Sequence, residues 1–206
     1  ILEQTLPQEN NQNITRLMLN MPPSYGKTEI IARTFIAWAL GRFPQRKFFY
    51  ISYSDELCKK ISNQVRDLIK SSFWRGIFGK SPIFIQDNAN EFMLKEGGGL
   101  FVTTLKSSLT GFHAHQILID DPIKVADMNS RAERNRVNQT FKESVLSRLQ
   151  DRNSNITILM QRLGHEDLCG FLLDEKNFTS QAISAWKVIK LQAINKEPQT
   201  YEIGDF

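Results

Sequence analysis

Two patterns of hydrophobic and polar residues alternate along the chain. Short apolar runs are typical of buried strands, and longer stretches with apolar residues at helical spacing are typical of helices. The apolar runs predict strands at residues 16–20, 47–53, 100–105, 117–119, 155–160 and 185–191. Helical spacing predicts helices at residues 27–40, 54–71, 130–149 and 164–173. Strands that alternate with helices in this way favour a mostly parallel sheet that is covered by helices on both faces.

Two regions depart from this alternation. Residues 72–100 are less regular, and they predict short strands near 83–86 and 91–95 with the glycine run 97–99 as a turn. Glycine-rich turns between short apolar runs are typical of hairpins, so we expect a small β-hairpin insertion here. Residues 1–15 are rich in Gln and Asn, and they predict a loose N-terminal lead-in.

The stretch from Leu17 to Ile31 has the order of a phosphate-binding loop. An apolar run leads into a tight loop that ends in Gly26-Lys27-Thr28, and a helical pattern follows. Backbone N–H groups at a helix N-terminus are unpaired, and the helix dipole favours an anion there. We expect Lys27 to reach the β- and γ-phosphates of a nucleotide and the Thr28 hydroxyl to hold Mg²⁺. Met21 stands where the usual motif has its first glycine. The triplet alone is also compatible with an ordinary helix start.

A second motif lies roughly ninety residues downstream. Ile117, Leu118 and Ile119 are apolar without alternation, which is typical of a parallel strand buried on both faces. Asp120 and Asp121 follow at its carboxyl end, the edge where open α/β sheets bind ligands. Asp120 is placed to hold Mg²⁺, and Asp121 to orient or deprotonate an attacking water. Asp-Asp-Pro is also a common turn, but its combination with the Gly-Lys-Thr loop favours a nucleotide site.

Length and composition agree with one folded domain. The chain has 206 residues, of which 41% are hydrophobic, enough for a substantial core. It contains no apolar run long enough for a membrane span and no recognisable signal peptide. Cys58 and Cys169 are far apart in sequence and outside any C-x-x-C pair. This pattern favours reduced thiols in a cytosolic protein, without a disulfide or metal role.

Positive charge is concentrated in one part of the chain, whose net charge is +4. Nine basic and three acidic residues lie between Arg42 and Lys80. Such a block can contact a polyanion, but it is equally compatible with a solvated helix face. The outer face of the helix predicted at 54–71 carries four of the basic residues, which are Lys59, Lys60, Arg66 and Lys70. His113 and His115 have too few neighbouring ligands for a metal site.

Seven segments share an order and spacing that extends across residues 16–194. They are residues 20–29, 37–44, 50–54, 109–112, 117–124, 147–149 and 161–168. Together they resemble the N-terminal ATPase domain of phage terminase large subunits, which are DNA-packaging motors. A Pro-Pro lead-in to Gly-Lys-Thr is typical of that family, so Met21 agrees with the resemblance.

The resemblance implies a three-layer P-loop NTPase of the ASCE/RecA-like class, with an extra strand between the two Walker strands. It implies an ATP hydrolase in which Mg²⁺-dependent hydrolysis drives double-stranded DNA into a capsid. The implied partners are DNA, a portal, a small terminase subunit and further copies in a ring, in the cytoplasm of a bacterial host. The ATPase domain would span residues 16–194, and residues 195–206 would form a tail or linker. The nuclease domain that normally follows is not recognisable, so we expect no DNA cleavage.

Several roles carry over by motif position. Lys27 and Thr28 match the phosphate lysine and the Mg²⁺ hydroxyl, and Asp120 matches the Walker B aspartate. Asp121 occupies the position of the catalytic glutamate and is one methylene shorter. Gln161 occupies the coupling position, where an amide can donate to phosphate and accept from water. The residues implied to surround the nucleotide are Pro23, Ser24, Tyr25, Gly26, Lys27, Thr28 and Glu29.

The family also implies an arginine near the γ-phosphate, worth about 10³–10⁵ in rate in related enzymes. Arg162 is next to Gln161 and is the catalytic candidate by position. Arg131, Arg134 and Arg148, on or beside the helix predicted at 130–149, remain open, as does an arginine from a neighbouring subunit.

Two other functions remain compatible with the sequence. One is a catalytically weak nucleotide- or DNA-binding prophage remnant without a nuclease, which the Asp at position 121 and the short chain favour. The other is a helicase-like translocase, which would need a second RecA-like domain.

Overall fold

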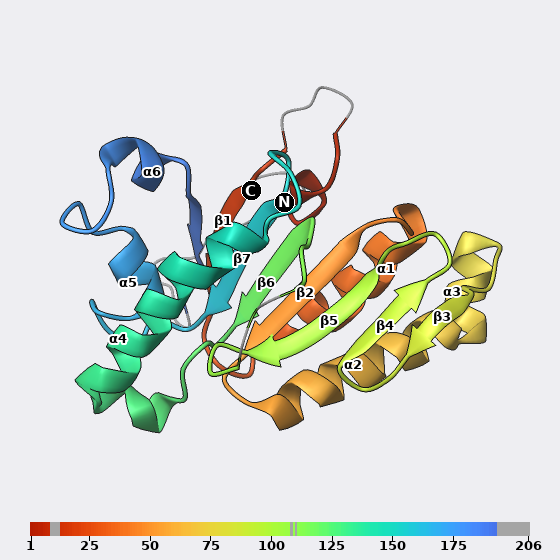
Figure 1. Cartoon of the computed structure of the whole chain (residues 1–206), viewed down its shortest axis with the longest axis horizontal. Coiled ribbons are helices and arrows are strands. Elements are labelled where there is room, and N and C mark those ends of the chain that lie inside the picture. The colour runs from red at the N-terminus through yellow and green to blue at the C-terminus, as the bar shows by residue number, and fades with distance from the viewer. Residues whose placement is uncertain (9–12, 108, 110, 193–206) are drawn as a thin grey trace.

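The computed structural model describes residues 1–8, 13–107, 109 and 111–192. Its strands are β1 (Arg16–Asn20), β2 (Lys47–Ser52), β3 (Phe84–Asp87), β4 (Glu91–Leu94), β5 (Gly99–Thr104), β6 (Gln116–Asp120), β7 (Asn155–Met160) and β8 (Lys187–Lys190). Within the described ranges these strands form one sheet in the order β3–β4–β5–β2–β6–β7–β1–β8 (Figure 1). The sheet is parallel from β5 to β8 and antiparallel at the β3–β4 edge. Strand β7 lies between β1 and β6.

Helices cover both faces of this sheet. The segment after β1 begins as the π-helical η2 (Thr28–Thr34) and continues as α1 (Phe35–Arg42). With α2 (Asp55–Lys70) and α3 (Ser72–Phe78) it lies on one face, and α4 (Arg131–Thr140) and α5 (Leu168–Leu172) lie on the other (Figure 1). The short helix α6 (Ser180–Ser184) precedes β8. Short 3₁₀ segments are η1 (Glu3–Thr5) and η3 (Val125–Asn129).

Two hydrophobic cores fill the space between the three layers. Alternate residues of β2 belong to different cores, with Phe48 and Tyr50 in the one under α1 and α2, and Phe49 and Ile51 in the one under α4. A strand buried on both faces needs apolar residues at every position, because successive side chains point to opposite faces. The structure therefore confirms the predicted α/β architecture, with a mostly parallel sheet flanked by helices.

The antiparallel edge depends on the glycine run before β5. Gly97 has a φ of +92°, and its N–H donates to Leu94 O at 2.9 Å. A Cβ atom on Gly98 would lie 2.3 Å from Pro44 O and 2.5 Å from Arg46 O. Only glycine therefore allows this turn to pack against the loop before β2. β4 then pairs with β5, and β3 pairs with β4 through a register irregularity near Gln86.

Three predicted helices differ from the structure. The helix expected at 27–40 is π-helical in η2 and becomes α-helical only at Phe35. The helix expected at 130–149 changes type, because α4 passes into the π-helical η4 (Phe141–Val145) and the 3₁₀ segment η5 (Leu146–Arg148). The helix expected at 164–173 begins only at Leu168, because the buried Asp167 side chain caps it by accepting from Gly170 N at 2.8 Å. Helix α3 was not predicted, although Ser71 caps it by accepting from Trp74 N at 3.1 Å.

Part of the segment predicted as a lead-in packs on the domain, and its extent to residue 15 stays a prediction. Thr5 and Leu6 are fully buried, and Thr5 accepts a hydrogen bond from Gln116 at 2.7 Å. Residues 9–12 and the predicted tail at 195–206 lie outside the described residues, as does the expected domain boundary at residue 194. Among the helices that are described, none has the length and apolarity needed to cross a membrane.

Candidate functional site

The carboxyl ends of β1, β7 and β6 meet at one edge of the sheet. Asn20 of β1 is in register with Met160 of β7, and Leu159 of β7 with Asp120 of β6. The parallel pairing therefore brings together segments that are far apart in the sequence. They are the loop after β1, the Asp120–Asp121 pair and Gln161.

Most of the loop after β1 is exposed to solvent, but its last residue is buried. Pro23, Ser24 and Gly26 are exposed, whereas Lys27 is only 7% exposed. Ser24 and Gly26 have φ angles of +65° and +72°, in the left-handed region that favours glycine. Ile30 N donates to Gly26 O at 2.9 Å, so the helical segment begins immediately after the loop. A loop that runs directly into the start of a helical segment can offer backbone N–H groups to an anion.

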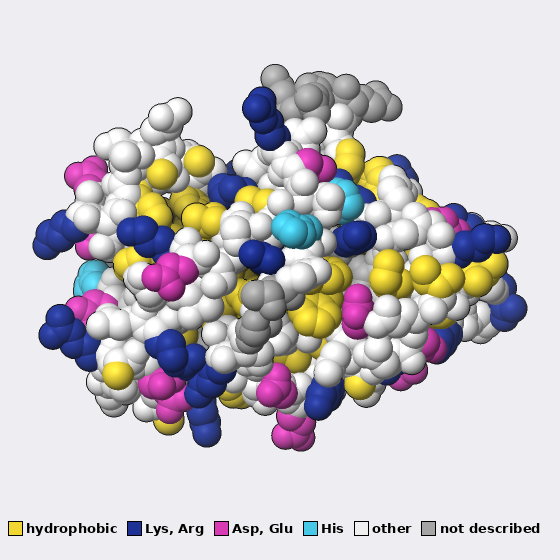
Figure 2. Space-filling view, viewed as in Figure 1, with side chains coloured by type: hydrophobic (Ala, Val, Ile, Leu, Met, Phe, Trp, Pro, Cys, Tyr) yellow, Lys and Arg dark blue, Asp and Glu magenta, His cyan; other side chains and the backbone are white. Residues whose placement is uncertain are grey.

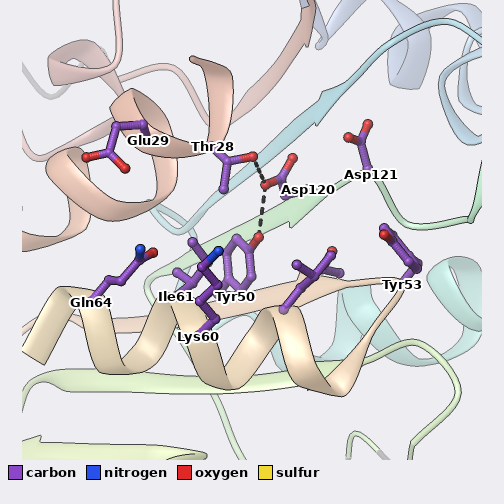
Figure 3. A pocket seen from close by; sticks show the side chains of 11 residues that line it. Thr28, Glu29, Tyr50, Tyr53, Lys60, Ile61, Gln64, Asp120 and Asp121 are labelled. Carbon is purple, nitrogen blue, oxygen red and sulfur yellow. Dashed lines mark hydrogen bonds between the residues drawn. The ribbon is translucent and has the colours of Figure 1, made fainter. Parts of the chain in front are cut away.

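Asp120 is the buried centre of the site. One of its oxygens, Oδ2, accepts hydrogen bonds from the Thr28 hydroxyl at 2.7 Å and the Tyr50 hydroxyl at 2.9 Å (Figure 3). The other oxygen, Oδ1, is buried and has no hydrogen-bond partner among the described residues. Burial, and the nearby charge of Asp121, raise the pKa of Asp120 to about 6, although both hydrogen bonds act in the opposite direction.

Lys27 and Asp121 form an ion pair beside Asp120. The Lys27 Nζ lies 2.6 Å from Asp121 Oδ2, and the Asp121 side chain is 29% exposed. Asp121 has a φ of +41°, a conformation that Asp tolerates better than most residues. Its N–H donates to Leu159 O at 2.9 Å, which fixes the turn after β6 to β7. The structure thus brings Lys27, Thr28, Asp120 and Asp121 together, as the sequence predicted.

A cavity of about 280 Å³ opens beside these groups. Its walls come from the start of η2, the carboxyl ends of β2 and β6, and one face of α2 (Figure 3). The lining residues are Thr28, Glu29, Tyr50, Ser52, Tyr53, Leu57, Lys60, Ile61, Gln64, Asp120 and Asp121. Lys60 is the cation on this lining, and it has no ion-pair partner in the described part of the chain.

The α2 and β2 residues of this wall were missed as site residues. Leu57, Lys60, Ile61 and Gln64 recur at helical spacing, which is a signal that they share one side of α2. The sequence does not say that this side faces a cavity, and Lys60 was assigned to the outer face. Tyr50 was recognisable as a strand position and as part of the segment 50–54 that resembles the family, but not as a residue of the site.

Other basic residues of the block from Arg42 to Lys80 are partly neutralised. Arg66 and Lys70 of α2 contact Asp87 of β3 at 2.8 and 2.6 Å, and Arg46 is buried. Figure 2 shows the face covered by α4, where basic and acidic side chains are interspersed, whereas α2 lies on the other face of the sheet. Contact between this block and a polyanion therefore stays a prediction.

The proposed arginine lies in a different environment. The Arg162 Nε donates to both carboxylate oxygens of Asp167 at 3.1 and 2.9 Å, and its Nη2 donates to Gly164 O at 3.0 Å. Arg134 binds Glu166 at 2.6 Å, and Arg148 binds Ser147. None of the candidate arginines, including Arg131, lines the cavity described above. Gln161 follows β7 directly and is half-buried. The catalytic roles of Gln161 and Arg162 stay predictions.

The donor set at Asp120 fits a magnesium ion. A buried carboxylate oxygen without a partner is costly unless a cation or donor reaches it, and the Thr28 hydroxyl lies within hydrogen-bond distance of the same carboxylate. Mg²⁺ usually binds through one or two protein oxygens, several waters and substrate phosphates. Residues outside the masked segments provide no cluster of three or more His, Cys, Asp or Glu side chains. A protein cage for another metal is therefore not found among them.

Fold and site together define a three-layer α/β protein with a pocket that contains carboxylate and hydroxyl groups at the carboxyl edge of a parallel sheet. Solved structures with a similar fold include phage large terminases. The HK97 bacteriophage large terminase has a TM-score of 0.58 at 11% identity, covering 94% of this chain and 41% of that one. The large terminase from a thermophilic bacteriophage, in complex with ADP, has a TM-score of 0.58 at 10% identity. A second crystal form of the thermophilic phage protein has a TM-score of 0.56 at 11% identity.

The two comparisons with the thermophilic phage protein each cover 95% of this chain and 46% of the other, so this chain spans less than half the length of the terminases it matches. At these identities the likeness shows a shared fold. No protein-family model matches the sequence, and no curated protein matches it either.

Proposed function

We propose that this chain is a Mg²⁺-dependent ATPase of the P-loop type and that it forms the motor domain of a DNA-packaging terminase. One observation carries the proposal. Lys27 and Thr28 are about ninety residues from Asp120 and Asp121 in the sequence, yet contacts of 2.6 Å (Lys27–Asp121) and 2.7 Å (Thr28–Asp120) bring the four side chains to one edge of the sheet. All of them except Lys27 line the cavity there. A lysine, a hydroxyl and two carboxylates at this edge are the groups that phosphoryl transfer needs for phosphate binding, Mg²⁺ binding and water activation.

Each group has a distinct role in this proposal. The loop from Pro23 to Glu29 surrounds the phosphates, and Lys27 exchanges its contact with Asp121 for the β- and γ-phosphates. Thr28 and Asp120 hold Mg²⁺, Thr28 through a lone pair that its hydrogen bond to Asp120 leaves available. A bound Mg²⁺ would supply positive charge that stabilises the phosphate oxygens. Asp121 then orients the attacking water, and Gln161 contacts the γ-phosphate.

A further positive charge is needed near the outer phosphate. Lys60 lines the cavity next to Asp120 without an ion pair among the described residues, whereas Arg162 is bound to the buried Asp167. The geometry therefore favours Lys60 over Arg162 as the cation from this chain. An arginine from a neighbouring subunit is compatible with the same site.

The DNA-packaging part of the proposal is supported by the fold shared with the large terminases of HK97 and the thermophilic phage. The partners it implies are double-stranded DNA, a portal, a small terminase subunit and further copies in a ring, in the bacterial cytoplasm. The thermophilic phage protein was crystallised with ADP, which supports a nucleotide site in this fold.

The test is ATP hydrolysis by the purified chain, with Mg²⁺ and with EDTA, for the parent and for Lys27→Ala. We expect Mg²⁺-dependent phosphate release that Lys27→Ala lowers by about 10²–10³-fold or more, because the removed ammonium stabilises phosphate charge. Lys59→Ala, on an exposed part of α2, is the matched control and should retain the parent rate. If Lys27→Ala hydrolysed ATP as fast as the parent, the site assignment would be wrong.

A second candidate function is a nucleotide-binding module with little turnover. The ion pair of 2.6 Å between Lys27 and Asp121 favours it, because each group neutralises the other. Measuring ATP affinity and turnover separately distinguishes the two functions. Tight binding without hydrolysis, both in the parent and in Asp121→Glu, would support the binding module.

A further inference from the structure

Tyr50 contributes a buried hydroxyl to the site from a strand outside both nucleotide motifs. It lies in β2, which pairs in parallel with β6 so that Ser52 is in register with Asp120. The tyrosine is 1% exposed and packs in the core under α1 and α2. Its hydroxyl reaches Asp120 Oδ2 at 2.9 Å (Figure 3).

The Tyr50 hydroxyl acts as a hydrogen-bond donor to Asp120. The usual pKa of a tyrosine phenol is about 10, so the hydroxyl keeps its proton at neutral pH. A buried tyrosine hydroxyl needs a partner, and here the partner is a carboxylate, which makes the hydrogen bond a strong one. The ring packs in the core under α1 and α2.

The two donors on Asp120 are not equivalent. Thr28 belongs to the phosphate loop, and its hydroxyl is itself a proposed Mg²⁺ ligand, so its surroundings change on loading. Tyr50 binds the same oxygen, Oδ2, from the rigid sheet. Together they saturate Oδ2 and leave Oδ1 as the oxygen of Asp120 without a partner among the described residues.

We propose that Tyr50 is a positioning residue for the metal ion. Its hydroxyl holds the Asp120 carboxylate in the orientation that keeps Oδ1 available, and thereby sets the affinity of the nucleotide site for a divalent cation. The inference rests on the proposed function and goes beyond it, because neither the phosphate-loop motif nor the Asp-Asp-Pro motif contains this residue. Partners behind a metal ligand commonly tune affinity in this way.

The test is Mn²⁺ binding to the protein–ADP complex, measured by electron paramagnetic resonance. Tyr50→Phe removes only the hydroxyl and keeps the packed ring. We expect Mn²⁺ affinity to fall by about 10–100-fold, the usual effect of losing a partner behind a metal ligand. ADP affinity in EDTA should stay at the parent value, because the phosphate loop is unchanged. The melting temperature of each variant is measured first, and each titration is run well below it.

Tyr53→Phe is the matched control, since Tyr53 lines the same cavity but makes no hydrogen bond to Asp120. It should bind Mn²⁺ like the parent. Parent-like Mn²⁺ affinity in Tyr50→Phe would overturn the inference while leaving the proposed function intact. Equal losses in Tyr50→Phe and Tyr53→Phe would also overturn it, because they would indicate a general effect on the cavity. A parent that binds neither ADP nor Mn²⁺ would refute the proposed function and this inference together.

Discussion

The two ends of strand β6 bury polar side chains in opposite ways. At its amino end, Gln116 is fully buried, and its Nε2 donates to Thr5 Oγ1 at 2.7 Å and to Asn155 Oδ1 at 3.1 Å. At its carboxyl end, Asp120 is 4% exposed and accepts from Thr28 and Tyr50. Each residue also has one buried oxygen without a hydrogen-bond partner in the described residues.

The two ends differ in the charge of the buried oxygen and in whether that oxygen belongs to a group that lines a cavity. The oxygen of Gln116 belongs to a neutral amide, and leaving it unpaired costs about 1–3 kcal/mol. Its other contacts tie the N-terminal segment to β7, so this end supports the fold. The oxygen of Asp120 belongs to a carboxylate that lines a cavity. Burying an ionised group costs much more free energy than burying an amide oxygen. A buried carboxylate beside a cavity is therefore typical of a functional site. Substitutions at the two ends should separate stability from activity.

Asp120→Asn should have the largest effect. The folded pKa of about 6 is above the usual value near 3.9, so ionisation of Asp120 destabilises the fold. A shift of about two units corresponds to about 3 kcal/mol as an order of magnitude. This cost is fully present above about pH 6 and disappears as the pH falls through 6 toward 4, where the carboxyl is protonated in both states.

The nucleotide-free Asp120→Asn variant should therefore be more stable than the parent at pH 8, and the difference should shrink at pH 5. At the same time ATP turnover should fall by about 10²–10³-fold or more, because the Mg²⁺ ligand is lost. Urea unfolding in EDTA at the two pH values, with phosphate-release assays, measures both effects. A stability difference that is equal at pH 5 and pH 8 would contradict the role assigned to the buried charge.

Gln116→Ala should have the opposite profile. It removes the donor for Thr5 and Asn155, so we expect a loss of about 1–3 kcal/mol of unfolding free energy. ATP turnover per folded molecule should stay at the parent value, because Gln116 is at the other end of the strand. Gln150→Ala, at an exposed position, is the control and should stay within about 0.5 kcal/mol of the parent. A loss of turnover in Gln116→Ala without unfolding would show that the two ends are coupled.

Lys60→Met should have the smallest effect of the three and extends the comparison to the wall of the cavity. We expect about a tenfold loss of turnover, or about 1.4 kcal/mol, if the exposed ammonium of Lys60 faces the outer phosphate. Lys59→Met, its exposed neighbour on α2, should retain the parent rate.

Arg162→Met should lower the melting temperature, because it removes a partner of the buried Asp167. If instead Arg162→Met lost turnover and Lys60→Met did not, Arg162 would be the catalytic cation.

Much of the fold was predictable because its signals are local. The apolar runs and helical spacings identified the strands of the parallel sheet and helices near α1, α2 and α4, since burial on two faces or on one stripe leaves a period in the sequence. Errors occurred where one side chain overrides the period. Asp167 accepts from Leu163 N and Gly170 N, both at 2.8 Å, which holds residues 163–167 in a turn and delays the start of α5. Ser71 similarly starts α3 in a region without clear periodicity.

The candidate site was predictable in its core for the same reason. Gly26, Lys27 and Thr28 are adjacent, and Asp120 and Asp121 end an apolar strand, so each half is a local motif. The sequence by itself determined these two halves, the α/β class and the edge of the sheet at which they lie. The tertiary structure alone decided that β7 separates β1 from β6, that Lys27 contacts Asp121, that Arg162 binds Asp167, and that Tyr50 and Lys60 join the pocket. Those contacts depend on which strands become neighbours and which side of α2 faces them, and a periodic pattern carries information about burial but not about the identity of the neighbour.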